Sequence, residues 1–248
     1  GASGGEPNDP NFRNVTLLLH GDGSNGAQNN TFLDSSTNNF TITRNGNTTQ
    51  GSFSPYGSNW SNYFDGSGDN LTIPSNAAFG FGTGDFTIEF WAYIPTWTGD
   101  AQLIGCHTAF AGFDWLIQQF SSGQFRWLDS SLTLQSGTVP VTNQWNHYAV
   151  TRSGTTLRIF LNGTQTASGT STANIPATKA LGIMGDSGAS ATQIGYMSNV
   201  RILKGTALYT AAFTPSTTPL TAITNTSLLT CQSNRFIDNR TNNFTITR

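Results

Sequence analysis

The stretch DFTIEFWAYI at residues 85–94 decides the fold of this chain. Its apolar residues recur at every second position, which is the period of a β-strand with one buried face. These residues are Phe86, Ile88, Phe90, Ala92 and Ile94. The positions between them carry Thr87, Glu89, Trp91 and Tyr93. Because this second face is only partly polar, the pattern predicts a central strand rather than an edge strand.

Short strands separated by turn residues extend this pattern on both sides. They are predicted at residues 15–20, 40–43, 70–74, 102–106, 115–120, 125–129, 145–152, 156–161, 180–184 and 195–203. The dipeptide Asn162-Gly163 predicts a hairpin with a type I′ turn, which needs φ > 0 at both central residues. Only residues 206–213 (TALYTAAF) suggest a helical turn. The whole pattern predicts an all-β fold, an antiparallel sandwich or jelly roll.

The composition indicates a packed domain with a polar but weakly charged surface. Charged residues make up 10% of the chain, against about 25% in typical proteins. Aromatic residues reach 12%, which supplies the apolar area for a core and argues against disorder. The net charge is −2 and no basic patch stands out, so no nucleic-acid partner is expected. No apolar run of roughly 18 residues occurs, so no membrane insertion is expected.

An octapeptide occurs twice in the chain. The sequence TNNFTITR stands at residues 37–44 and again at 241–248, an offset of 204 residues. Upstream of the octapeptide, FLD at 32–34 matches FID at 236–238. Further upstream, leucines 17–19 align with leucines 228–229 when a gap of about six residues is allowed. A period near 200 is the size of a whole domain. The chain is therefore interpreted as one full unit and the opening of a second, a module from a longer array.

Three sequence blocks carry a resemblance to a known family. They are residues 63–91 (from YFDG through NLTIP to DFTIEFW), 145–163 (from WNHYAVTR to TLRIFLNG) and 194–202 (IGYMSNVRI). In order and spacing they resemble the laminin-G-like, concanavalin A-like lectin/glucanase domains. The resemblance implies a jelly roll of two antiparallel sheets that binds carbohydrate or protein without catalysis.

The resemblance also suggests a domain organisation. Residues 1–13 are expected to be a linker or a cloning remnant, and residues 14–225 the laminin-G-like domain. Residues 226–248 are expected to be either a closing strand of this unit or the start of a second repeat.

A narrower resemblance concerns residues 200–220 (VRILKGTALYTAAFTPSTTPL) and the repeated octapeptide. Both are similar to modules of large structural and tail proteins of marine phages. The resemblance implies a place on a virion or an extracellular surface. It implies cell-surface glycans as partners, so that the module recognises a host. The alternative is a structural or decoration module that packs against other virion or surface proteins and has no sugar site.

Catalysis is not expected. Retaining glucanases of this superfamily carry a Glu-x-Asp-x-x-Glu strand, because two carboxylates about 5–5.5 Å apart are needed. Here Glu89 stands without such a partner, and the other glutamate is Glu6 in the expected linker. The lyases of the superfamily need Arg, Gln, His and Tyr on one sheet face, whereas adjacent His147 and Tyr148 point to opposite faces.

Calcium is the one cofactor that the resemblance implies. Domains of this kind often bind the ion with an aspartate of an early loop and with later backbone carbonyls. Asp22 and Asp34 occupy that loop here and are the candidate ligands. The late aspartate that relatives carry is Asn199 in this chain, which removes a charge from the site. The alternative is that Asp22 and Asp34 are turn residues.

A sugar site needs an aromatic plate and amide or hydroxyl groups. The candidates are Trp97, on an expected loop tip, with Trp115, Trp127 and Gln119 on two neighbouring predicted strands. The pair Trp115 and Trp127 either lines a concave face or fills the core. Trp91 and Trp145 stand where the family uses tryptophan for packing, so a core position is expected for both.

The two cysteines do not indicate whether the protein resides in an oxidising or a reducing cellular compartment. Cys106 and Cys231 either pair across the unit or remain as two buried thiols. Both alternatives are compatible with the sequence.

Overall fold

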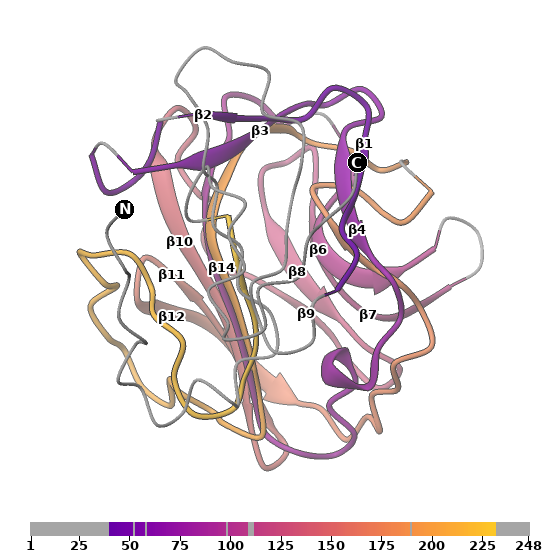
Figure 1. Cartoon of the computed structure of the whole chain (residues 1–248). Coiled ribbons are helices and arrows are strands. Elements are labelled where there is room, and N and C mark those ends of the chain that lie inside the picture. The colour runs from indigo at the N-terminus through magenta and orange to yellow at the C-terminus, as the bar shows by residue number, and fades with distance from the viewer. Residues whose placement is uncertain are drawn as a thin grey trace, which may run out of the picture.

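In the computed structural model, two antiparallel sheets pack face to face. The structure describes residues 40–231 except 52, 58, 98, 109–111 and 189. Figure 1 shows strands of one sheet on the left (β10, β11, β12 and β14) and strands of the other on the right (β4, β6, β7, β8 and β9). Described residues outside the strands include one 3-10 turn, η2 (Ala77–Phe79). The predicted jelly-roll sandwich of two antiparallel sheets is confirmed.

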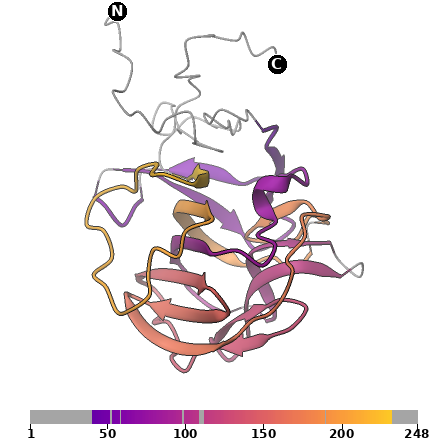
Figure 2. The same cartoon turned by 90° about the horizontal axis from the view of Figure 1, so that it is seen from below.

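The described residues form a seven-stranded and an eight-stranded sheet. The order in the smaller sheet is β1 (Thr43–Asn45), β4 (Asn70–Ile73), β13 (Leu181–Ile183), β6 (Ala101–His107), β7 (Phe113–Gln119), β8 (Phe125–Leu128) and β9 (Thr133–Gln135). The order in the larger sheet is β12 (Thr164–Thr170), β11 (Thr156–Leu161), β10 (Trp145–Ser153), β5 (Phe86–Tyr93), β14 (Ile194–Lys204), β3 (Ser61–Asp65) and β2 (Thr49–Gly51). The eighth strand of the larger sheet, β15 (Thr226–Thr230), pairs with β14 and lies beside it as the yellow strand of Figure 2.

Strand β5 lies at the centre of the larger sheet, as its sequence predicts. It pairs with β10 on one side and with β14 on the other. The side chains of Phe86, Ile88 and Phe90 are fully buried. A strand whose two edges are both paired and whose inner face is covered must be central, so the prediction is confirmed.

Aromatic rings fill the space between the sheets. The rings of Trp115 and Trp127 stack at 5.5 Å and 14°, and Phe86 of the opposite sheet stacks on Trp127 at 5.2 Å. All three side chains have 0% exposed surface. Burial of one such side chain contributes about 1.5–3 kcal/mol. Stacked aromatic rings from both sheets therefore meet at the centre of the core.

The Asn162-Gly163 hairpin has the predicted turn. Both residues have positive φ, 50° and 79°, as a type I′ turn requires. It joins β11 to β12. Gly163 is needed for a second reason, because a Cβ at this position would collide with the carbonyl oxygen of Phe213.

The helical turn expected at residues 206–213 is wrong. This stretch belongs to an irregular segment, residues 205–221, here called the covering segment, which crosses the outer face of the larger sheet. Its backbone bonds to the sheet: Phe213 N–H donates to the Gly163 carbonyl at 2.9 Å, and the Thr151 hydroxyl donates to the Tyr209 carbonyl at 2.7 Å. These contacts satisfy groups that a helix would have paired internally, so tertiary structure overrides local propensity.

Both cysteines are free and buried. Cys106 lies in β6 of the smaller sheet, whereas Cys231 follows β15 of the larger sheet. Burial raises the pKa of the Cys231 thiol to about 12 and that of Cys106 well above its usual value. Of the two alternatives, the structure shows unpaired thiols.

The predicted boundaries at residues 13 and 225 remain predictions. Residues 1–13 lie outside the described part of the chain, and 226–230 form β15. No helix among the described residues is long and apolar enough to cross a membrane.

Candidate functional site

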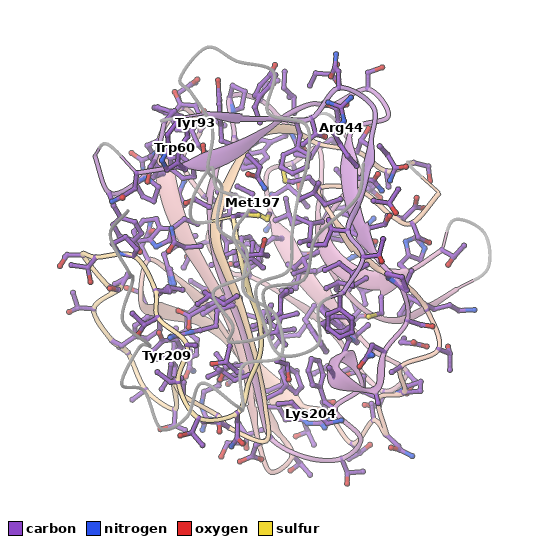
Figure 3. All side chains as sticks on the ribbon, viewed as in Figure 1. Arg44, Trp60, Tyr93, Met197, Lys204 and Tyr209 are labelled. Atoms are coloured by element: carbon purple, nitrogen blue, oxygen red, sulfur yellow. The ribbon has the colours of Figure 1, made fainter. Side chains whose placement is uncertain are left out.

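The outer face of the larger sheet carries rows of aromatic and charged side chains. Strands β10, β5 and β14 align so that Trp145, Tyr93 and Tyr196 form one row. Trp91 and His147 follow in the next row, and Glu89 lies opposite Arg201 in the third. Figure 3 places Tyr93 and Tyr209 toward opposite ends of this side of the molecule. The aromatic row is half-buried, whereas the covering segment lies over the charged row.

A pocket of about 410 Å³ opens between these aromatic residues and the covering segment. Its lining comes from three parts of the chain that are distant in sequence. They are Pro55 and Tyr56 of the loop before β3, Trp91, Trp145 and Asn162 of the sheet and its hairpin, and Pro215, Ser216 and Thr217 of the covering segment. The volume falls within the range typical of small-ligand sites.

The loop at residues 53–57 completes the aromatic wall. Phe53 packs against Tyr93, Trp145 and Tyr196 with ring centroids 4.9, 5.4 and 4.8 Å away. Phe53 itself is 43% exposed. Tyr56 meets Trp91 edge to face at 5.9 Å and 77°. The pocket is thus walled by rings from two layers, which is an arrangement that suits an apolar ligand face.

Three polar atoms of this wall make no hydrogen bond of ordinary geometry among the described residues. They are the indole Nε1 atoms of Trp91 and Trp145 and the hydroxyl of Tyr56. An unsatisfied buried group costs about 1–3 kcal/mol. Burial raises the pKa of Tyr56 to about 12, although the Trp91 indole opposes the rise, so the phenol stays neutral at physiological pH. An indole N–H is a donor only, so these groups suit a ligand that presents oxygen acceptors.

Asn162 is held rigidly at the rim of the pocket. Its Oδ1 accepts from the His147 backbone N–H at 2.7 Å, and its Nδ2 donates to Asn146 Oδ1 at 3.0 Å. The hairpin turn therefore orients a side chain that lines the pocket.

A buried ionic cluster holds the covering segment on the sheet. Glu89 Oε1 accepts from Arg201 Nη2 at 2.5 Å and from Nε at 2.8 Å. Glu89 Oε2 accepts from the Tyr209 hydroxyl at 2.8 Å and lies 3.1 Å from His147 Nε2. Arg201 Nη1 also donates to the Thr221 carbonyl at 2.7 Å. The cluster thus joins β5, β10 and β14 to both ends of the segment that supplies Pro215–Thr217 to the pocket.

The cluster is a positioning device rather than an open reactive site. Glu89 and His147 have 0% exposed surface and Arg201 has 5%. Burial alone would raise the pKa of Glu89, but His147 and Arg201 outweigh it and hold the pKa below the usual 4.5. The carboxylate is therefore ionised and fully engaged in holding its neighbours.

The cluster predicts a loss of stability in acid. A carboxyl whose pKa is lowered on folding stabilises the fold above its unfolded pKa, near 4.5, and loses this contribution as pH falls through the lower folded value. We expect the free energy of unfolding to fall steeply below about pH 4.5. Urea denaturation between pH 7 and pH 3 measures this, and Glu89→Gln is expected to flatten the slope. An unchanged slope in that variant would contradict the assignment.

The structure corrects three of the predicted sugar contacts. Trp115, Trp127 and Gln119 all have 0% exposed surface. Trp115 Nε1 donates to the Phe79 carbonyl at 2.9 Å, Trp127 Nε1 donates to Asp129 Oδ2 at 2.8 Å, and Gln119 Nε2 donates to the Gly123 carbonyl. A ring sealed between two sheets cannot stack on a sugar. The alternative role for the two tryptophans, filling the core, is the one the structure shows.

The core position expected for Trp91 and Trp145 is also wrong. Both side chains lie half-buried on the outer face and line the pocket. Sequence reasoning therefore missed the pocket residues Tyr56, Trp91 and Trp145. The signal that could have found Trp91 was its place on the second face of residues 85–94.

The remaining candidates stay predictions. Trp97 is half-buried beside Gly123, packs against the core, and does not line the pocket. Asp22 and Asp34 lie outside the described residues, so the calcium site is untested. Within the described part of the chain, no group of three or more His, Cys, Asp or Glu gathers as a metal site. Asn199 is buried, and its Oδ1 accepts from the Leu220 N–H at 2.9 Å.

Comparison with known proteins identifies the family. A sequence profile described as the Concanavalin A-like lectin/glucanases superfamily matches residues 65–211, more than half of the chain. The chain belongs to this superfamily. No curated protein matches the chain in sequence.

Solved structures share the fold at low identity. The binding domain of Paraclostridial Mosquitocidal Protein 1 is similar with a TM-score of 0.60 and 15% identity, covering 80% of this chain and 50% of that one. The Botulinum Neurotoxin serotype G binding domain gives 0.58 and 15%, covering 79% and 48%. Trypanosoma rangeli sialidase gives 0.52 and 16%, covering 78% and 30%. The chain thus spans half or less of these proteins, and the likeness shows the fold alone.

Proposed function

We propose that this domain is a non-catalytic carbohydrate-binding module of a phage or bacterial surface protein and that it recognises host glycans. The observation that carries the proposal is the aromatic pocket formed by Tyr56, Trp91 and Trp145. Its ligand would be a neutral sugar unit, because none of the described residues that line the pocket carries a charge.

The chemistry of the pocket suits a sugar in two ways. A pyranose presents an apolar C–H face, for which a Trp or Tyr ring is a flat apolar partner. It also presents hydroxyl and ring oxygens, which can accept from the Nε1 groups of Trp91 and Trp145. Both indole nitrogens are covered in this structure, and Tyr56 packs against Trp91, so we propose that the ring of Tyr56 shifts when a sugar reaches Trp91.

The pocket does not suit glycoside hydrolysis. That reaction needs two carboxyl groups beside the scissile bond. The described lining residues provide neither a carboxylate nor an imidazole, and Glu89 is sealed beneath the covering segment. Two of the similar solved structures are described as binding domains, which supports the non-catalytic proposal.

The repeat supports a role in multivalent attachment. One shallow pocket of this size would bind weakly, whereas linked copies gain avidity without any new contact. The repeated octapeptide indicates such an array. The alternative is a structural virion module without a sugar site.

A glycan array tests the proposal. The module, presented multivalently, is expected to bind a restricted set of neutral glycans, and Trp145→Ala or Trp91→Ala is expected to weaken binding tenfold or more, since a central aromatic contact contributes about 1.4 kcal/mol or more. Trp97→Ala is the matched control, because Trp97 is also half-buried but lies outside the pocket. A parallel array with chelator tests the calcium prediction at Asp22 and Asp34.

Each other outcome of this experiment is informative. If only Trp97→Ala abolished binding, the sugar site would lie at the loop of Trp97, and its assignment to the pocket would be wrong. A blank array with correctly folded protein would favour the structural module.

A further inference from the structure

Strand β1 forms one edge of the smaller sheet, and its first two residues, Thr43 and Arg44, end the first copy of the repeated octapeptide. Its register pairs are Thr43 with Thr72 and Arg44 with Leu71 of β4. Phe40 and Ile42 just before it pack against the core, with the Phe40 ring 5.5 Å from that of Phe79. The surface of β4 and η2 against which this strand and Phe40 pack is here called the β1 slot.

The second copy carries the same side chains as the part of the first copy that occupies the slot, and only Asn45 at the end of β1 lies outside the repeat. Residues 241–248 repeat 37–44 without a single difference, so Phe244 and Ile246 correspond to Phe40 and Ile42. Thr247 and Arg248 correspond to Thr43 and Arg44, which make two of the three register pairs. Because register is specified by the side chains on the buried face, an identical segment fits the slot in the same register.

The segment that precedes the second octapeptide already forms a strand of this domain, β15. β15 occupies the edge of β14, where Val200 pairs with Thr230 and Ile202 with Leu228. Leucines 228–229 of β15 align with leucines 17–19 of the N-terminal copy. One copy thus supplies a strand to the larger sheet and the other supplies β1 to the smaller sheet.

The tether from this docked strand is long enough to reach the slot. Cys231 Sγ lies 2.9 Å from Asn62 Nδ2 in β3, and Gln50 of β2 pairs with Asn62. β2 follows β1 within a few residues. Thr247 lies sixteen positions after Cys231, and an extended chain of that length spans up to roughly 53 Å.

We propose that the β1 slot is a strand-exchange site, in which Thr247 and Arg248 of the same chain take the place of Thr43 and Arg44 on β4, with Phe244 and Ile246 in the positions of Phe40 and Ile42. The first copy holds the slot most of the time, because its connection to β2 is much shorter. Loop closure over sixteen residues rather than about four is roughly eightfold less favourable. Weakening the first copy therefore shifts the slot to the second. In a protein with consecutive units, such exchange would join neighbouring units through shared edge strands.

Disulfide trapping on the full chain tests the proposal. Thr72→Cys is combined with Thr247→Cys, because the equivalent pair Thr43 and Thr72 lies directly across the two strands. Thr72→Cys with Thr43→Cys is the positive control for the slot, and each single cysteine variant controls for the native thiols, which are both buried. The product is expected to be a monomer with a 72–247 disulfide at about a tenth of the yield of the control.

Two further pairs of substitutions separate exchange from random collision. Phe40→Ala with Ile42→Ala is expected to raise the 72–247 yield severalfold. Phe244→Ala with Ile246→Ala removes the same groups from the second copy, leaves the slot intact, and is expected to abolish the disulfide. The Phe244→Ala with Ile246→Ala variant tests strand exchange even if the variant with Phe40→Ala and Ile42→Ala fails to fold.

Three results would overturn the proposal. They are an absent 72–247 disulfide while the control pair forms, a disulfide that persists with Phe244→Ala and Ile246→Ala, and a disulfide found only between two molecules. The last result would assign the slot to a second copy of the chain.

Discussion

Glu89→Gln is expected to lower the free energy of unfolding by about 3–5 kcal/mol, because it leaves buried charge without its partner. Arg201 is 5% exposed and both of its bonds to Glu89 are charge-assisted. A guanidinium cannot release its proton to escape this environment. The glutamine side chain would also place an NH₂ group where one carboxylate oxygen of Glu89 now accepts hydrogen bonds, so that hydrogen-bond donors would face each other. The substitution therefore disturbs Arg201, His147 and Tyr209 together.

Chemical denaturation of a double-mutant cycle measures this effect. Arg201→Met alone is expected to be destabilising, and the double variant Glu89→Gln with Arg201→Met is expected to lose less than the sum of the two singles. Arg158→Met is the matched control, since Arg158 forms no ion pair among the described residues. A loss below about 1 kcal/mol for Glu89→Gln would mean that water or a rearranged covering segment satisfies Arg201.

Gly163→Ala is expected to destabilise the domain by about 2–4 kcal/mol and to displace the covering segment. Two terms add. An L-residue at φ 79° costs about 1–2 kcal/mol, and forcing a methyl group into a filled space costs about 1–3 kcal/mol. The atom it meets is the backbone oxygen of Phe213, which cannot rotate away. The hydrogen bond from Phe213 N–H to Gly163 would be lost with the displacement.

The neighbouring hairpin provides the control for this prediction. Gly154 also has a positive φ of 58°, but a Cβ there would have nothing within 4 Å. Gly154→Ala is therefore expected to cost about 1–2 kcal/mol, from backbone strain alone. Thermal unfolding of the two variants separates strain from collision. Equal losses would show that the covering segment does not press on the hairpin. A loss of glycan binding in Gly163→Ala would further connect the segment to the pocket.

Local patterns in the sequence predicted the fold because they depend on neighbouring residues. The alternation in residues 85–94 is a consequence of strand geometry, and it predicted a central strand before any partner strand was known. The Asn162-Gly163 turn was predicted for the same reason, since its φ values are a property of two residues.

The site could not be predicted in the same way. Alternation separates two faces of a strand without saying which one meets solvent when both are apolar. Trp115 and Trp127 were candidates for sugar contact, with core filling as the alternative, and they are in the core, whereas Trp91 and Trp145 were expected in the core and line the pocket. The choice depends on where the opposite sheet lies, which no local pattern contains.

The amino-acid sequence by itself determined the all-β class and the hairpin, because both follow from the spacing of neighbouring residues, and it showed the internal repeat directly. Only the tertiary structure decided how Glu89 meets Arg201 and Tyr209 across 112 and 120 residues. It likewise brought Tyr56 and Pro215 to the edge of one pocket. Contacts between distant segments are set by the packing of whole sheets, where the burial of apolar faces outweighs local preference.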